Sequence, residues 1–477
     1  MNNCFTRGGG LKILTLALRN KSKTFLFIVF FILCTSISQL SESKENQTLN
    51  KSADSLQELS ISGASRLRLE NHADSIRANS ANNQILTMRT SIEISYTSNL
   101  SSLNLELMDS RQALAETDGP INSGDVNVLD IQQLNFQTKF GLNKSHTLKI
   151  GRFTTNHGNR RLVARPVYRN TMNTFDGLEL VSRFKNGKQI QILASQPVLR
   201  KPEEKGELIR NDFTLDKSSS ALRFYGATLD LPDVSNIQES LNLNINPLNA
   251  DFFGYLLREK DTLQRQSKNR KLRTFGFRLK SEPESGKIDI EIHSSQQSGT
   301  QRASLNPMDQ RDLRHKAFFR NFVFGYTFQG KQRARVSFEF DHGSGDSDPG
   351  DNKSERYDSL FGVTAPLYGP TGFYGVFNMS NTITPGLRLS FNPTLNLNLM
   401  LSYRHFWLDA TSDSLGRSKK RARKGTTDNY VGQHLELRSR WNPLDSVRVE
   451  TGVVFLALKN FRNRNSTFFW FGAERRF

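Results

Sequence analysis

The feature that most constrains how this chain folds is an alternation of apolar and polar residues that returns along most of its length. From Leu86 to Tyr96, one set of alternate positions reads Leu, Met, Thr, Ile, Ile, Tyr and the other reads Thr, Arg, Ser, Glu, Ser. Residues 288–293, 333–341 and 395–404 repeat the pattern. Successive side chains of a strand point to opposite faces, so each segment predicts a strand with one apolar and one polar face. No amphipathic helix of three turns interrupts the series, and the sequence therefore predicts an all-β fold.

The links between these strands alternate in length. Short, turn-rich links stand at residues 142–145, 185–187, 282–286, 329–330, 392–394 and 442–445. Long polar loops stand between them, at residues 109–126, 198–219, 258–271, 298–315, 342–385 and 409–429. Short turns on one rim and long loops on the other are typical of a transmembrane antiparallel β-barrel, and threading the strands through these links gives about 18 of them.

Composition narrows the class of fold further. A mean hydropathy of -0.53 excludes a protein built of membrane-spanning helices. A soluble β-sandwich would place its polar faces outside and keep a dry interior. Here the polar face carries Arg, Glu, Gln and Asn in strand after strand, which fits a water-filled lumen better. The 34 phenylalanines supply positions for the face that meets lipid.

The first residues have the layout of a secretory signal peptide. A basic stretch with five cations up to Lys23 precedes an apolar run from Phe25 to Cys34 and the small residues that follow it. Ten apolar residues are too few for an anchor helix, which needs about 20. A lipoprotein signal has a small residue before its cysteine, and Leu33 stands before Cys34, which argues against a lipoprotein. We therefore expect a signal peptide over residues 1–38, a flexible lead-in over 39–59 and the barrel over 60–477.

Charge and cysteine content limit the possible partners and chemistry. The chain has 65 Lys and Arg against 46 Asp and Glu, a formal net charge of +19, and removing the five presequence cations leaves 19 - 5 = +14. Such an excess indicates an anionic partner. Both cysteines, Cys4 and Cys34, lie in the presequence, so the exported body has no disulfide, thiolate metal site or cysteine nucleophile.

The last residues, Ser466 to Phe477, form an aromatic strand that ends in phenylalanine. Phe469, Phe471 and Ala473 share one face, although Arg475 occupies the next position of that face. This strand resembles the C-terminal strand that the barrel assembly machinery recognises, which predicts that machinery as a partner through the Phe477 strand.

Several segments, in order along the chain, resemble the alginate export family of outer-membrane barrels. They begin with the R-x-R-x-E pattern at 66–70, the G-R block at 151–152 with Phe153 in place of the usual Gln, the G-x-x-R-L-V block at 158–163 and F-D-G at 175–177. Further matches lie at 274–279, 344–346, 369–375, 406–408 and 432–438. The resemblance covers nearly all of the exported chain and implies an 18-stranded barrel that secretes an anionic polysaccharide across the bacterial outer membrane.

Strand parity, the alternation of successive side chains between the two faces of a strand, assigns the polar faces to the lumen if the apolar faces meet lipid. An inward arginine can hold a carboxylate through two parallel hydrogen bonds, while interspersed acids keep each contact weak enough to release. The residues predicted to bind substrate in the lumen are Arg66, Arg68, Arg89, Arg278, Arg335, Arg404, Arg438, Arg440, Glu106 and Glu436. The alternative is that these groups only pair across strands and stiffen the wall.

Three more lumen candidates rest on the family resemblance: Arg152, Arg161 and Asp176. Simple alternation from Leu148 and Ile150 would place Arg152 on the lipid side. Either the register breaks at Gly151, since a glycine often marks a bulge, or Arg152 lies at the rim.

Two long loops suggest further roles. Loop 342–385 is long enough to enter the mouth as a gate or partial plug; its acids lack the register of a calcium loop. The run Arg417–Lys424 carries six cations in eight residues, and on an extracellular loop it would touch lipopolysaccharide phosphates or an exiting polyanion, or simply be solvated. No nucleic acid partner is expected for an exported chain.

No enzyme motif stands out. The eight histidines are scattered, without an H-x-x-H pair or a G-x-S-x-G elbow, and the sequence predicts no metal and no cofactor. We therefore expect a passive outer-membrane channel for an anionic polysaccharide or anionic solutes. A general anion-preferring porin and an outer-membrane hydrolase are the alternatives.

Overall fold

A computed structural model of the chain describes residues 57–78, 81–234, 245–263, 265–418, 420–421, 428–461 and 465–477. The expected signal peptide, most of the lead-in and half of the run 417–424 lie outside these residues. β1 begins at Gln57, so the last three residues of the expected lead-in already belong to the first strand.

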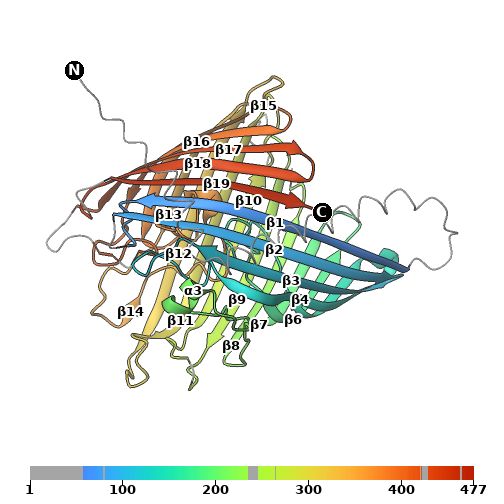
Figure 1. The fold of residues 1–477 in the computed structure, drawn as a ribbon, viewed down its shortest axis with the longest axis horizontal. Coiled ribbons are helices and arrows are strands. Elements are labelled where there is room, and N and C mark those ends of the chain that lie inside the picture. Colours follow the sequence, from blue (N-terminus) through green and yellow to red (C-terminus); the bar gives the residue numbers. More distant parts are fainter. Residues whose placement is uncertain are drawn as a thin grey trace.

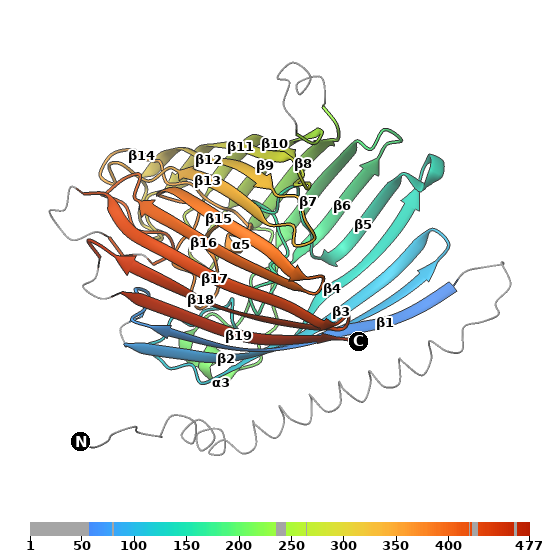
Figure 2. The same ribbon diagram turned by 90° about the horizontal axis from the view of Figure 1, so that it is seen from above.

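The described chain forms one closed antiparallel barrel (Figures 1 and 2). Its sheet contains 19 named strands, of which β14 is a two-residue segment that pairs in parallel with β12, so 18 strands make the wall. The wall strands are β1 Gln57–Ala73, β2 Asn82–Ser98, β3 Ser101–Ala113, β4 Asn127–Phe140, β5 His146–Phe153, β6 Phe175–Arg183, β7 Gln189–Pro197, β8 Leu222–Leu231, β9 Leu248–Glu259, β10 Lys271–Ser281, β11 Ile288–Arg302, β12 Asp312–Thr327, β13 Arg335–Gly343, β15 Thr382–Thr394, β16 Leu397–Trp407, β17 Tyr430–Leu444, β18 Val447–Leu458 and β19 Ser466–Arg476.

The barrel closes between its first and last strands. β1 pairs with β2 on one side and with β19 on the other, and Figure 1 shows β1 beside β19. The terminal residue continues this ladder, because Gly63 N donates to Phe477 O over 2.7 Å and Phe477 N donates to Gly63 O over 3.0 Å. Closure leaves no unpaired wall edge, which a bilayer would penalise. The predicted all-β barrel and its strand number are confirmed.

The alternation of side chains also places the two faces as expected. On β12, Phe322 and Phe324 are exposed on the outside, while Asn321, the residue before Phe322, is 3% exposed. The short links predicted from the sequence all lie on one rim, and the long loops rise from the opposite rim. The described residues contain no helix that is long and apolar enough to cross a membrane; helix α3 spans Lys205–Arg210 and α5 spans Ala365–Tyr368.

Two loops from the long-loop rim fold into the barrel and pack against each other. We call them together the lumen plug; they are residues 154–174, between β5 and β6, and 344–381, between β13 and β15. They join through a parallel bridge between Val163 and Phe361, where Ala164 N donates to Phe361 O over 3.2 Å. Loop 344–381 lies within the predicted loop 342–385, which was expected to enter the mouth as a gate or partial plug, but loop 154–174 was not recognised as a long loop.

The plug reaches wall strands on widely separated sides of the barrel. The Tyr357 hydroxyl lies 2.7 Å from the Ser295 hydroxyl on β11. The Phe377 ring stacks on Phe406 of β16 with the ring centroids 3.7 Å apart. Tyr374 of the plug contacts Phe468 on β19. This part of the lumen is therefore packed with apolar and aromatic side chains and is not filled with water.

Candidate functional site

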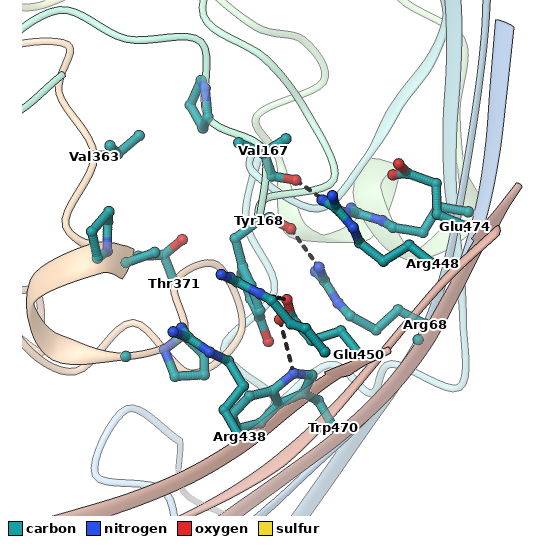
Figure 3. A pocket seen from close by; sticks show the side chains of 18 of the residues that line it. Arg68, Val167, Tyr168, Val363, Thr371, Arg438, Arg448, Glu450, Trp470 and Glu474 are labelled. Atoms are coloured by element: carbon teal, nitrogen blue, oxygen red, sulfur yellow. Dashed lines mark hydrogen bonds and ion pairs between the residues drawn. The ribbon is translucent and has the colours of Figure 1, made fainter. Parts of the chain in front are cut away.

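Below the plug, toward the short-turn rim, lies a cavity of about 340 Å³ that we call the basic cavity (Figure 3). Its walls come from both plug loops and from β1, β15, β17, β18 and β19. Its charged lining residues are Arg66, Arg68, Arg160, Arg388, Arg438, Arg440, Arg448, Glu436, Glu450 and Glu474. Seven arginines thus face three glutamates, and the lining has a formal charge of 7 - 3 = +4.

Strand parity brings the wall residues of this cavity together. On β17, Leu437 and Trp441 are exposed on the outer face at 42% and 46%, so Arg438 and Arg440 project inward. The neighbouring strand β18 presents Glu450 opposite Arg440, and Arg440 Nε donates to Glu450 Oε2 over 2.5 Å. The alternation seen in the sequence therefore builds the basic wall of the cavity.

Three of the predicted lumen arginines hold the plug. Arg66 donates to Val167 O over 2.8 Å, to Arg169 O over 3.0 Å and to Asn170 Oδ1 over 3.2 Å. Arg89 donates to the same two carbonyl oxygens over 3.3 Å and 3.1 Å. Arg68, which follows Arg66 on the inward face of β1, donates to Tyr168 O. Consecutive plug carbonyls thus occupy donors of the arginines that the sequence analysis predicted to bind substrate.

The plug residue Tyr168 is fixed from several directions. The Arg68 guanidinium lies 4.1 Å from the centroid of the Tyr168 ring, and the Tyr168 hydroxyl donates to Glu70 Oε1 over 2.8 Å. Beside it, Trp470 Nε1 donates to Glu450 Oε1 over 3.2 Å. In Figure 3 the labelled side chains Arg68, Trp470 and Glu450 come from the wall and Tyr168 from the plug. The aromatic and ionic groups together make a defined contact between plug and wall.

Some cavity arginines have little local neutralisation. Among the described residues, no carboxylate lies within ion-pair distance of Arg160 or Arg448; Arg160 donates to Arg165 O and Arg448 to Asn442 Oδ1. The nearest carboxylate of Arg438 belongs to Glu436, at 3.7 Å. Arg388 is bound more tightly, by Glu339 at 2.9 Å. Arg160, Arg438 and Arg448 therefore account for most of the surplus positive charge of the cavity.

The other predicted lumen residues lie in compact ion pairs outside the basic cavity. Those on wall strands point inward, and each contacts an oppositely charged group at 3.1 Å or less. The pairs are Arg161 with Glu291, Arg278 with Asp251 and Glu291, Arg335 with Asp289, Arg404 with Asp341 and Glu339, and Glu106 with Arg165. Arg161 belongs to the plug, so its pair with Glu291 also ties plug to wall. These contacts match the alternative in which such groups stiffen the wall.

Arg152 and Asp176 do not line the lumen, which corrects that prediction. The β4 and β6 ladders place Arg152 opposite the exposed Leu134 and opposite Asp176, with no shift of register at Gly151. Both side chains therefore lie on the outward side, where Arg152 Nε donates to Asp176 Oδ1 over 2.7 Å. Simple alternation gives the correct side here, and Arg152 stands one residue before the long-loop end of its strand.

Reasoning from the sequence missed several residues of the cavity, among them the cations and the tyrosine Arg160, Tyr168, Arg388 and Arg448. Parity could have found two of them, because Arg388 lies between Leu387 and Leu389, and Arg448 lies between two valines. The other two lie on the plug, where no periodic pattern reports the direction of a side chain.

One acid in a loop that contacts the plug has a perturbed pKa. Burial raises the pKa of Asp125, which lies in the loop before β4, to about 7, and the nearby Glu70 carboxylate adds to the shift. Asp125 Oδ2 accepts hydrogen bonds from Asn122, and Asp125 O accepts one from the plug residue Asn170 over 2.9 Å. The contact between this loop and the plug therefore includes a group that titrates near neutral pH.

Comparison with known proteins gives a family and a fold. The alginate export family matches residues 57–466. Among solved structures from Pseudomonas aeruginosa, OccK9 (OpdG) has a TM-score of 0.56 and 12% identity, covering 88% of this chain and 99% of that chain. OccK2 (OpdF) in complex with glucuronate has a TM-score of 0.53 and 11% identity, covering 88% of this chain and 98% of that chain. OpdK with vanillate has a TM-score of 0.55 and 11% identity, with the same two coverages. No curated protein matches the sequence significantly.

Proposed function

This chain belongs to the alginate export family, whose members form channels in the bacterial outer membrane, and we propose that it passes an anionic polysaccharide or anionic solutes by passive transport. The single observation that carries the proposal is the basic cavity, in which seven arginines face three glutamates. The finer parts of the proposal are the anionic cargo and the arginines that would contact it.

The cavity has the chemistry that a chain of carboxylated sugars requires. A guanidinium stays charged and presents a planar fork of donors that fits a carboxylate. Arg160, Arg438 and Arg448 are the groups we propose to meet the anion first, because no carboxylate holds them closely. The glutamates between them would keep each contact shallow, as conduction through several weak sites demands.

Binding in this cavity would act on the plug as well. Arg66 and Arg68 line the cavity and also donate to the carbonyl oxygens of Val167 and Tyr168. A carboxylate that enters would compete for the same donors, and a charged acceptor forms the stronger hydrogen bond. We propose that anion binding loosens the plug from β1, which couples the presence of cargo to opening.

Planar bilayer recordings test the proposal. We expect the wild-type channel to prefer anions and to be blocked by polymannuronate. In the variant Arg160→Gln/Arg438→Gln/Arg448→Gln, the polymer should block at least about tenfold more weakly, because the loss of even one charge-assisted contact is worth about 1.5 kcal/mol. A matched control, Arg335→Gln/Asp289→Asn, removes an inward ion pair without changing net charge and should keep the block. Cation preference in the wild type would refute the proposal.

A general porin for small anions is the second candidate. It is favoured by the likeness in fold to OccK2 solved with glucuronate and OpdK solved with vanillate, both of which are carboxylates. Current carried by glucuronate without block by polymannuronate would favour this alternative. We propose no catalytic role, since the family and these neighbours are channels; turnover that depends on one histidine while conductance survives would indicate the hydrolase alternative.

Two partners follow from the proposed location. We propose that the barrel assembly machinery engages the strand that ends at Phe477, because its aromatic outer face and terminal phenylalanine match the expected signal. Outer-membrane lipid would cover the outward phenylalanines, and lipopolysaccharide would surround the long-loop rim. Cross-linking from Phe477 during assembly would test the first of these contacts.

A further inference from the structure

An unusual set of cations lies on the outer face of the barrel, close to the long-loop rim. Following the ladders from β8 to β12, one row of directly opposed residues reads Arg223, Arg258, Lys271, Thr300 and Arg314. The next row on the same face reads Tyr225, Leu256, Arg273, Ser298 and Lys316. We call these residues the outer basic rows. They contain six cations and no acid.

The outward direction of these side chains follows from burial along each strand. On β10, Lys271, Arg273 and Phe275 are exposed, while Leu272 and Thr274 between them are buried at 2% and 1%. On β12, Arg314 and Lys316 are exposed on either side of the buried His315. The outer basic rows therefore share the face that carries the exposed phenylalanines of the barrel and lie outside the lumen.

Placing cations opposite one another costs free energy. Arg223, Arg258 and Lys271 are direct neighbours on three adjacent strands, and like charges in that arrangement repel. Among the described residues, none of the six cations has a carboxylate within ion-pair distance. The surface is therefore built as if an anion outside the chain supplied the missing negative charge.

The rows also line a groove that continues onto apolar surface. Apart from Arg223 and Tyr225, every member of the rows borders a groove of about 1460 Å³, together with Lys260, Lys353 and the exposed Phe275. The two acids of the groove are engaged elsewhere: Arg270 Nε lies 2.8 Å from Glu259 Oε2, and Glu355 accepts from Ser347. Phe275 is 58% exposed on the membrane side of the rows, and Arg320 lies 4.8 Å over the ring of Phe318.

We propose that the outer basic rows bind a phosphorylated, multiply acylated glycolipid of the outer leaflet. Charge complementarity selects phosphate groups for the cations, while the adjoining phenylalanines offer a surface for acyl chains. The position fits this ligand, because the rows stand on the lipid-facing wall at the level where the apolar band ends. The site is separate from the basic cavity and does not depend on the proposed cargo.

Native mass spectrometry and a binding titration with bisphosphorylated, hexa-acylated lipid A test the proposal on the full-length barrel. The variant Arg258→Ser/Lys271→Ser/Arg314→Ser should bind it at least about tenfold more weakly, because each cation beside an anionic lipid contributes about a fivefold factor. The control Arg183→Ser/Lys185→Ser/Lys188→Ser removes the same number of exposed cations near the opposite rim and should bind as the wild type does. Bilayer conductance should be unchanged in both variants, since neither touches the lumen.

Two altered ligands and a charge-conserving variant distinguish binding of the glycolipid from binding of any polyanion. Lipid A without its phosphates should bind the wild type weakly, and the deacylated, phosphorylated sugar should bind more weakly than the intact lipid. Equal binding of the deacylated sugar would overturn the proposal in favour of a surface for any polyanion. The variant Arg258→Lys/Lys271→Arg keeps the charge and should keep the affinity. If all variants bind the intact lipid equally while migrating as folded barrels on gels, the rows are not its site.

Discussion

The sharpest prediction concerns the attachment of the plug to β1. Arg66→Met removes the guanidinium while keeping an unbranched apolar stem of similar length, so the wall is not left with a large cavity. The native side chain donates to Val167 O over 2.8 Å, to Arg169 O over 3.0 Å and to Asn170 Oδ1 over 3.2 Å. Arg66 is 9% exposed, so its hydrogen bonds to the plug are largely shielded from solvent in the native barrel.

The size of the effect follows from those three bonds. A hydrogen bond from a charged donor contributes about 1.5 to 3 kcal/mol, but Arg89 also reaches two of the three acceptors and compensates in part. We therefore expect the plug to be held about 3 kcal/mol more weakly in Arg66→Met, which raises the population of the detached plug by about a hundredfold.

Hydrogen exchange and single-channel recording measure this change. Amides of residues 167–171 should exchange about a hundredfold faster in Arg66→Met, and openings in a bilayer should become more frequent. The control Arg335→Met removes an inward arginine whose contacts are Asp289 and Ser337, both on the wall, and should leave those amides unchanged. Unchanged exchange at 167–171 in Arg66→Met would show that the arginine contacts do not hold the plug.

Three further changes probe the plug in other ways. In Gly362→Ala, the added Cβ would stand 1.6 Å from Arg161 O, so the two plug loops should separate and the plug amides should lose protection from exchange. Phe377→Ala removes a ring that is 2% exposed and stacked on Phe406, and should lower stability by about 3 to 5 kcal/mol, read from the midpoint of thermal unfolding. The pKa of Asp125 is raised to about 7 by burial, so the folded chain keeps a proton that the unfolded chain loses above about pH 4; stability should fall as pH rises from about 4 to 7, and Asp125→Asn should flatten that slope.

Much of the wall could be predicted from the sequence because one rule governs it. A strand that separates lipid from the lumen must alternate, and the alternation gives the direction of Arg66, Arg278 and Arg438 without knowledge of any partner. The same rule places Arg152 outward, against its inclusion among the lumen residues by family resemblance. Parity was thus the better guide at a position where motif and periodicity disagreed.

The candidate site could be predicted only in part, because half of its surroundings come from loops. Tyr168 and Arg160 reach the basic cavity through contacts with residues far away in sequence, such as Glu70 and Val363. No local pattern encodes such contacts. For the same reason, the sequence could not show that Arg66, Arg68 and Arg89 hold plug carbonyls instead of standing free in an open lumen.

The sequence by itself determined the barrel: the period of two set the faces of each strand, and the alternation of short and long links set the antiparallel order and the strand number. These properties are local or follow from chain order. Tertiary structure alone decided what fills the barrel and which charges remain available. Wall acids neutralise some inward arginines and plug carbonyls occupy others, which leaves a surplus of positive charge in the basic cavity. The register of β8 to β12 brings the outer basic rows together on the opposite face.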